Sequence, residues 1–121
     1  MQNNCINISE RLRAIAELVR ENVVLADVGT DHAFLPIYLL QTGKIKSAVA
    51  VDINEKPLSI AKTHIAEQGY SDKVKTFMSD GLENIESESV DDIVVAGMGG
   101  ELIANILEKA PWVKNSSYLK I

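Results

Sequence analysis

The chain has 121 residues, which is enough for one small domain but too few for two. Hydrophobic residues make up 46% of it and aromatic residues only 5%, so the core has to be built mainly from Ile, Val, Leu and Ala. The formal net charge of −5 argues against strong nucleic-acid binding by this segment alone, because neutralising phosphates requires clustered Lys and Arg. An RNA substrate held partly by another region stays open.

Signals for export, membrane insertion and metal binding are missing from the sequence. The start lacks the basic segment and apolar run of a signal peptide, and no apolar stretch approaches the roughly 20 residues of a membrane span. The single cysteine, Cys5, cannot form an intramolecular disulfide, and no ligand set with zinc spacing exists. We therefore expect a cytoplasmic protein with no membrane contact and no metal site.

The first predicted elements are a helix, a strand and a second helix. Apolar residues at helical spacing predict an opening amphipathic helix: Ile8, Leu12, Ile15 and Val19. Ser9 is its expected N-cap and Asn22 its expected stop. A β-branched run over 23–28 predicts a strand buried on both faces, and a helix is expected from about 35 to 42.

The same alternation continues to the end of the chain. A buried strand is predicted over 48–52, followed by a helix over 55–68 that begins after Asn54. The strand predicted over 74–78 is less apolar and therefore nearer an edge of the sheet. The last expected elements are a strand at 93–96, a turn at 97–100, a helix that Pro111 ends, and the start of a fifth strand at 118–121.

Strands separated by helices predict βαβ units, a parallel sheet and an α/β fold of the Rossmann-like type. Such sheets bind their ligands beyond the carboxyl ends of the strands. The candidate site residues therefore follow the predicted strands, in the segments 27–33, 52–54, 79–82 and 96–100.

The loop after the first strand favours one kind of cofactor over another. Gly29 lets the backbone approach a ligand closely, but Asp31 stands where the dinucleotide pattern G-x-G-x-x-G requires its second glycine. An extra carboxylate there repels a pyrophosphate and tolerates a sulfonium cation with an amino group. This residue favours S-adenosylmethionine over NAD.

Asp52 ends the second strand, 23 residues after Gly29. A carboxylate at this point accepts hydrogen bonds from ribose hydroxyls in either cofactor. The alternative is a solvated strand-end residue or a cap for the next helix. The position therefore predicts a nucleoside cofactor without specifying which one.

Two later segments have both a functional and a structural interpretation. Asp80 in the segment 79–82 could accept from an adenine amino group, or could belong to an ordinary Asp-Gly turn. The three glycines of 96–100 free the backbone to approach a flat group, or form a flexible turn. His32 could contact a ligand, or could simply cap or pack. No Ser-His-Asp or Cys-His arrangement is present.

Taken together, these motifs resemble the bacterial tRNA (adenine-22, N1)-methyltransferases, the TrmK family. The resemblance rests on ADVGTDHAFLP at 26–36, SDGL at 79–82 and AGMGG at 96–100, with Leu102-Ile103 behind and Arg11-Leu12 in the opening helix. It covers roughly residues 8 to 110. Three spaced motifs in the right order are more specific than any one alone.

The resemblance implies a class I methyltransferase fold, S-adenosylmethionine as cofactor, and methylation of N1 of an adenine in tRNA. The residues that it implies for cofactor binding are Asp27, Gly29, Thr30, Asp31, His32, Asp52, Ile53, Asp80, Gly81, Leu82, Ala96 and Gly97. Met98, Gly99 and Gly100 would face the target base, and Asp31 would be the catalytic residue.

The chain also departs from that family. Family members are longer, complete a larger sheet and add a C-terminal helical domain, and residues 112–121 fit the family poorly. We therefore expect residues 1–121 to be the N-terminal, cofactor-binding portion of a truncated protein, with the C-terminal strands and helical domain absent. Alternatives are a small domain that dimerises through an exposed sheet edge, a non-catalytic cofactor-binding or interaction module, and an NAD-dependent oxidoreductase.

Overall fold

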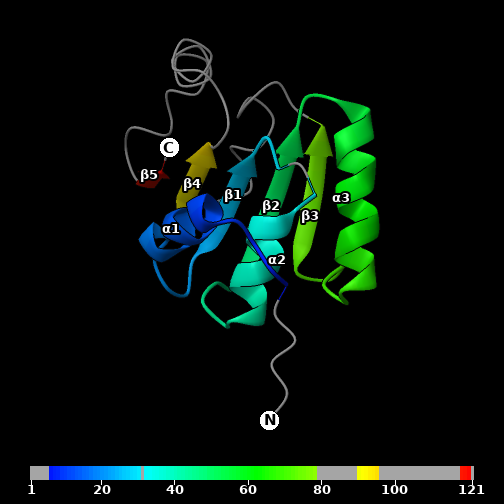
Figure 1. The fold of residues 1–121 in the computed structure, drawn as a ribbon. Coiled ribbons are helices and arrows are strands. Elements are labelled where there is room, and N and C mark those ends of the chain that lie inside the picture. Colours follow the sequence, from blue (N-terminus) through cyan, green and yellow to red (C-terminus); the bar gives the residue numbers. More distant parts are fainter. Residues whose placement is uncertain (1–5, 31, 79–89, 96–117, 121) are drawn as a thin grey trace.

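The protein is described from a computed structural model that covers residues 6–30, 32–78, 90–95 and 118–120. From α1 to β3, helices and strands alternate as predicted (Figure 1). In chain order they are α1 (Glu10–Leu18), β1 (Val24–Val28), α2 (Phe34–Gln41), β2 (Ser47–Asp52), α3 (Glu55–Glu67), β3 (Val74–Met78), β4 (Asp92–Val95) and β5 (Tyr118–Lys120).

The strands form one parallel sheet in the order β3-β2-β1-β4-β5. This order confirms the predicted α/β, Rossmann-like fold and the predicted edge position of β3. The chain runs outward from β1 through β2 to β3 and then returns to the other side of β1, so the order reverses between β1 and β4. β5 is the fifth strand that the sequence suggested, and it pairs with β4, so β4 is not an edge strand. Dimerisation through an exposed edge of the sheet stays a prediction.

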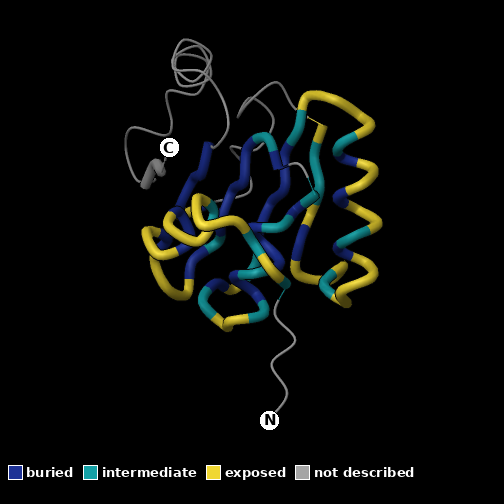
Figure 2. Tube along the Cα trace, in the orientation of Figure 1, coloured by how far each residue is buried: buried dark blue, intermediate teal, exposed yellow. Residues whose placement is uncertain are grey.

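The described helices pack against the sheet and against each other. α2 contacts β1 and β2, α3 contacts β2 and β3, and α1 packs on α2. Figure 2 shows β1, β2 and β4 almost wholly buried and much of α3 exposed. The core is aliphatic, as the composition predicted; its largest fully buried side chains include Leu25, Leu35, Ile37, Leu39 and Ile93. Among the described residues no helix combines the length and apolarity that crossing a bilayer requires.

The first helix ends earlier than predicted. The Ser9 side chain caps it by accepting from the Leu12 backbone N–H at 3.1 Å, but the helix stops at Leu18 and not near Asn22. Asn22 instead adopts a left-handed conformation, with φ of 59°, in the turn that leads to β1. The Lys44 ammonium donates to the carbonyl of Ala16 at 2.8 Å, which satisfies a backbone acceptor at this helix end.

An ion pair between Arg20 and Asp92 holds the chain just after this helix end. Arg20 donates from its backbone N–H to Asp92 Oδ2 at 2.8 Å and from Nε to Asp92 Oδ1 at 2.7 Å. Asp92 is fully buried at the first position of β4, whereas the Arg20 side chain is 45% exposed. The chain after α1 is thus tied to the amino end of β4. The candidate site lies at the other end of the strands, where they end.

The other bounds agree with the predictions to within one or two residues. Asn54 precedes α3 as expected, but its side chain makes no capping hydrogen bond. The predicted strand at 93–96 is observed as Asp92–Val95. Ala96, the turn at 97–100 and the helix predicted before Pro111 lie outside the described residues.

Candidate functional site

The carboxyl ends of three neighbouring strands bring the described candidate residues to one edge of the sheet. Val28 is paired in register with Val51, and Asp52 with Met78. Gly29 and Asp52, each one residue further along its strand, therefore lie at the same level on adjacent strands. Because ligands of open α/β sheets bind at this edge, near the point where the strand order reverses, we take it as the candidate site.

The turn after β1 is tied to β2 through its backbone. The N–H groups of Gly29 and Thr30 both donate to the Val51 carbonyl, at 2.8 and 3.1 Å. Gly29 has φ of 73°, in the left-handed region that a residue without a Cβ adopts easily. The two N–H groups are thus engaged in shaping the loop, and their bonds run to the protein and not toward a ligand.

Asp27 and Thr30 form a buried pair beneath this turn. The Thr30 hydroxyl donates to Asp27 Oδ2 at 2.9 Å, and the two residues are only 4% and 5% exposed. A buried carboxylate needs such donors, because transfer from water is costly unless it is hydrogen-bonded. This contact assigns both residues a part in fixing the loop; direct contact of either with a cofactor stays a prediction.

Asp52 is half-buried at the end of β2, and exposed apolar residues lie beside it. Its Oδ1 accepts the Asn54 backbone N–H at 3.0 Å; because Asn54 is the N-cap of α3, Asp52 supports the turn before the helix and does not cap the helix. Ile53 and Met78 are each 57% exposed. A carboxylate next to solvent-facing apolar side chains suits a ligand that joins a sugar to a flat ring. Met78 was missed by the sequence reasoning, although its place at the last position of an edge strand marked it.

His32, Phe34 and His64 form an aromatic cluster where the loop enters α2. The His32 and Phe34 rings stack at 5.0 Å, and the Phe34 and His64 rings meet edge to face at 5.3 Å. His64 Nδ1 lies 2.7 Å from the His32 carbonyl oxygen. Because a carbonyl only accepts, Nδ1 carries the hydrogen in this contact. No local pattern in the sequence marks His64 for this contact.

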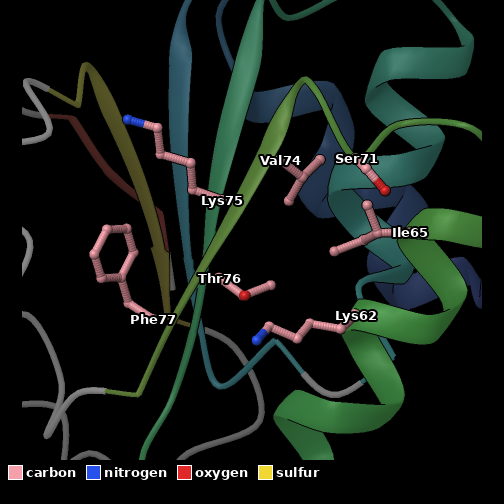
Figure 3. Close-up of a pocket in the computed structure, with 7 residues that line it drawn as sticks. All are labelled: Lys62, Ile65, Ser71, Val74, Lys75, Thr76 and Phe77. Carbon is pink, nitrogen blue, oxygen red and sulfur yellow. The ribbon is translucent and has the colours of Figure 1, made fainter.

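Two hollows adjoin α3. One, of about 420 Å³, is lined by His32, Phe34, Ser59, Ile60, Thr63, His64 and Glu67. The other, of about 530 Å³, lies along the edge strand β3 and is lined by Lys62, Ile65, Ser71, Val74, Lys75, Thr76 and Phe77 (Figure 3). The second hollow contains none of the predicted site residues, so we place the candidate site at the sheet edge beside the first.

Several predicted site residues lie outside the described part of the chain and stay predictions. They are Asp31, Asp80, Gly81, Leu82, Ala96, Gly97, Met98, Gly99 and Gly100.

Comparisons with known proteins find relatives that match most of this chain. A curated tRNA (adenine(22)-N(1))-methyltransferase of Bacillus subtilis (strain 168) is 40% identical over 105 residues, which are 87% of this chain and 44% of that protein. The structure of M. capricolum TrmK with S-adenosyl-homocysteine matches with a TM-score of 0.81 and 40% identity, over 85% of this chain and 47% of that chain.

A third relative was solved with the methyl donor itself. The provisionally assigned tRNA (m1A22) methyltransferase of Streptococcus pneumoniae, in complex with S-adenosyl-L-methionine, matches with a TM-score of 0.87 and 39% identity. That match covers 92% of this chain and 52% of the relative, so the chain spans about half the length of the proteins it matches. The resemblance inferred from the motifs is confirmed. The profile described as "Methyltransferase domain" matches residues 8–120, and the chain therefore belongs to the methyltransferase domain family.

Proposed function

We propose that residues 1–121 form the S-adenosylmethionine-binding, Rossmann-like domain of a tRNA (adenine-N1)-methyltransferase. The observation that carries this proposal is the position of Asp52 beside the Gly29 turn, at the edge where such sheets bind ligands. Relatives of 39–40% identity that carry S-adenosyl-homocysteine and S-adenosyl-L-methionine support the choice of cofactor.

The described residues fit such a cofactor at three points. Asp52 has one carboxylate oxygen on the Asn54 N–H, and its other oxygen is proposed to accept from the ribose. The exposed side chains of Ile53 and Met78 would cover the faces of the adenine ring. The loop shaped by Gly29, Thr30 and Asp27 would hold the methionine portion, with Asp80, Gly81 and Leu82 contacting the adenine.

The cofactor supplies an electrophilic methyl group, and the protein's part is alignment and charge stabilisation. Attack by N1 leaves positive charge on the target adenine, so a nearby carboxylate stabilises the transition state. We assign this role to Asp31, as acceptor from the N6 amino group. The segment 97–100 would hold the base with N1 in line with the transferred methyl group, after the base has left its stack in the RNA.

Calorimetric titration and a methylation assay test the proposal. The chain should bind S-adenosylmethionine and S-adenosylhomocysteine, and should transfer methyl groups to unmodified tRNA when it is fused to the C-terminal half of a homologous enzyme. Binding of NAD with neither sulfur nucleoside would refute the assignment and favour an oxidoreductase. Binding of the sulfur nucleosides without methylation would favour a cofactor-binding module, and would contradict the catalytic part of the proposal.

The Asp31→Asn substitution is expected to lower methylation of tRNA by about 10²- to 10³-fold, the range found when one transition-state hydrogen bond is removed. The full-length homologous enzyme is the suitable background. S-adenosylhomocysteine affinity serves as the control and should change much less than the rate. Full methylation activity in this variant would remove Asp31 from its assigned role.

The proposed substrate also bears on where the protein works. A tRNA methyltransferase meets its substrate in the cytoplasm, which is the location that we propose. With a net charge of −5, this portion is not expected to hold tRNA strongly by itself.

A further inference from the structure

The loop between β1 and α2 is held from two directions. On the β2 side, the Val51 carbonyl accepts from Gly29 and Thr30. On the α3 side, the His64 ring donates to the carbonyl of His32 at 2.7 Å. His64 projects from the second half of α3, so this contact joins two segments that are 32 residues apart in the sequence.

The peptide that His64 contacts is one whose orientation needs support. The His32 carbonyl belongs to the peptide bond that leads into Ala33, and Ala33 is fully buried with φ of 60°. A residue with a Cβ adopts this left-handed conformation only at an energetic cost. Ala33 also begins α2, where its carbonyl accepts from Ile37 and its N–H donates to Thr30. Relaxation of Ala33 to negative φ would re-aim the loop.

Phe34 adds a second constraint to the same contact. Its ring stacks on the His32 ring and also makes a T-shaped contact with the His64 ring, at an interplanar angle of 80°. The two imidazoles are therefore fixed relative to each other through one aromatic ring, as well as through the hydrogen bond. This arrangement restricts the ring of His64 to an orientation that aims Nδ1 at the His32 carbonyl.

We propose that His64 is a positioning residue for cofactor binding: by donating to the His32 carbonyl, it holds the described loop residues, Gly29, Thr30, His32 and Ala33, in their binding-competent shape. His64 is not assigned any contact with the cofactor. The inference rests on the proposed function, because it assumes that this loop contacts S-adenosylmethionine. The inference gives a residue of α3 a role in the site, whereas the sequence motifs placed the site only in the segments that follow the strands.

The role depends on one donor atom, so it can be separated from the packing of the ring. His64→Leu removes the donor and keeps an apolar side chain of moderate size against Phe34. His64→Asn keeps an N–H donor at the position that Nδ1 occupies, because both nitrogens are bonded to Cγ. Thr63→Val is the matched control, since it removes one hydroxyl from the same helix and the same hollow, where Thr63 donates only to the Ser59 carbonyl.

Calorimetric titration of S-adenosylhomocysteine into the 121-residue chain is the measurement, with thermal unfolding recorded for every variant. We expect His64→Leu to weaken binding about tenfold, the effect of one lost hydrogen bond at the upper end of the neutral range. His64→Asn should stay within about threefold of wild type and Thr63→Val should be unchanged, both well inside that tenfold effect. Equal affinity in His64→Leu and wild type would overturn the inference.

A second experiment covers the case in which His64→Leu does not fold. His64→Ala leaves space beside a hollow of about 420 Å³, which is large enough to admit free imidazole. Added imidazole should restore S-adenosylhomocysteine affinity to His64→Ala and leave wild type unaffected. Absence of rescue in a folded His64→Ala variant would count against the role. Failure of wild type itself to bind S-adenosylhomocysteine or S-adenosylmethionine would instead refute the proposed function.

Discussion

Asp52→Asn is expected to weaken S-adenosylhomocysteine binding about 30-fold, which corresponds to about 2 kcal/mol for one charge-assisted hydrogen bond. The substitution keeps an oxygen that can accept the Asn54 N–H, as Oδ1 does at 3.0 Å. It replaces the second oxygen by an amide group that donates, and it removes the negative charge. A ribose hydroxyl would therefore lose its acceptor while the start of α3 keeps its support.

Two further variants make this result specific. Asp52→Ala should bind as weakly as Asp52→Asn and should also lose about 1 kcal/mol of stability, because the Asn54 N–H then lacks its acceptor. Asp72→Asn removes one exposed carboxylate in the turn before β3, at the amino ends of the strands and away from the candidate site. This variant should leave S-adenosylhomocysteine affinity unchanged. Wild-type affinity in Asp52→Asn would remove Asp52 from the cofactor site.

Arg20→Met is expected to lower the free energy of unfolding by about 3 kcal/mol, as measured by urea denaturation. Asp92 is fully buried, and Arg20 supplies both its charged partner and a backbone donor. The substitution leaves the backbone donor in place and strands the carboxylate without a cation. We take the lower end of the range for a broken buried pair, because the Arg20 side chain is 45% exposed and its contact is partly screened.

The control is Arg13→Met, which removes an exposed arginine from α1 itself. This variant should change stability by less than about 0.5 kcal/mol. A double variant, Arg20→Met with Asp92→Asn, should recover part of the loss, since neutralising Asp92 removes the unpaired charge. If Arg20→Met unfolds at the wild-type urea concentration, the pair does not contribute to stability as we describe.

Much of the fold was predictable because local pattern and tertiary environment agree. The short, mainly apolar run in β1 and the inward apolar positions of α3, such as Leu58 and Ile65, identified their elements. The less apolar composition of β3 correctly indicated an edge strand. These signals are reliable because a strand buried on both faces is almost wholly apolar, whereas a strand with an exposed face carries more polar residues.

The parts that the sequence did not predict depend on contacts between distant residues. The chain that leaves α1 is held by the contact between Arg20 and Asp92, which are 72 positions apart, so no local signal marks this contact. His64 lies in the last turn of α3, where no local pattern marks it, and only the packing of α3 against the loop brings it to His32. The position of Asp52 at a strand end was predictable, because local sequence marks where a strand ends. Its hydrogen bond to the Asn54 N–H depends on the shape of the turn, which the sequence does not specify.

The ionic pair and the proposed binding edge occupy opposite ends of the same strands. β1 has five residues and therefore spans about 17 Å from the edge near Arg20 to the Gly29 turn. Perturbations this far apart usually combine additively. Thermal stability and ligand affinity should thus be adjustable independently in this chain, so that stabilising substitutions around Asp92 leave the proposed cofactor site unchanged.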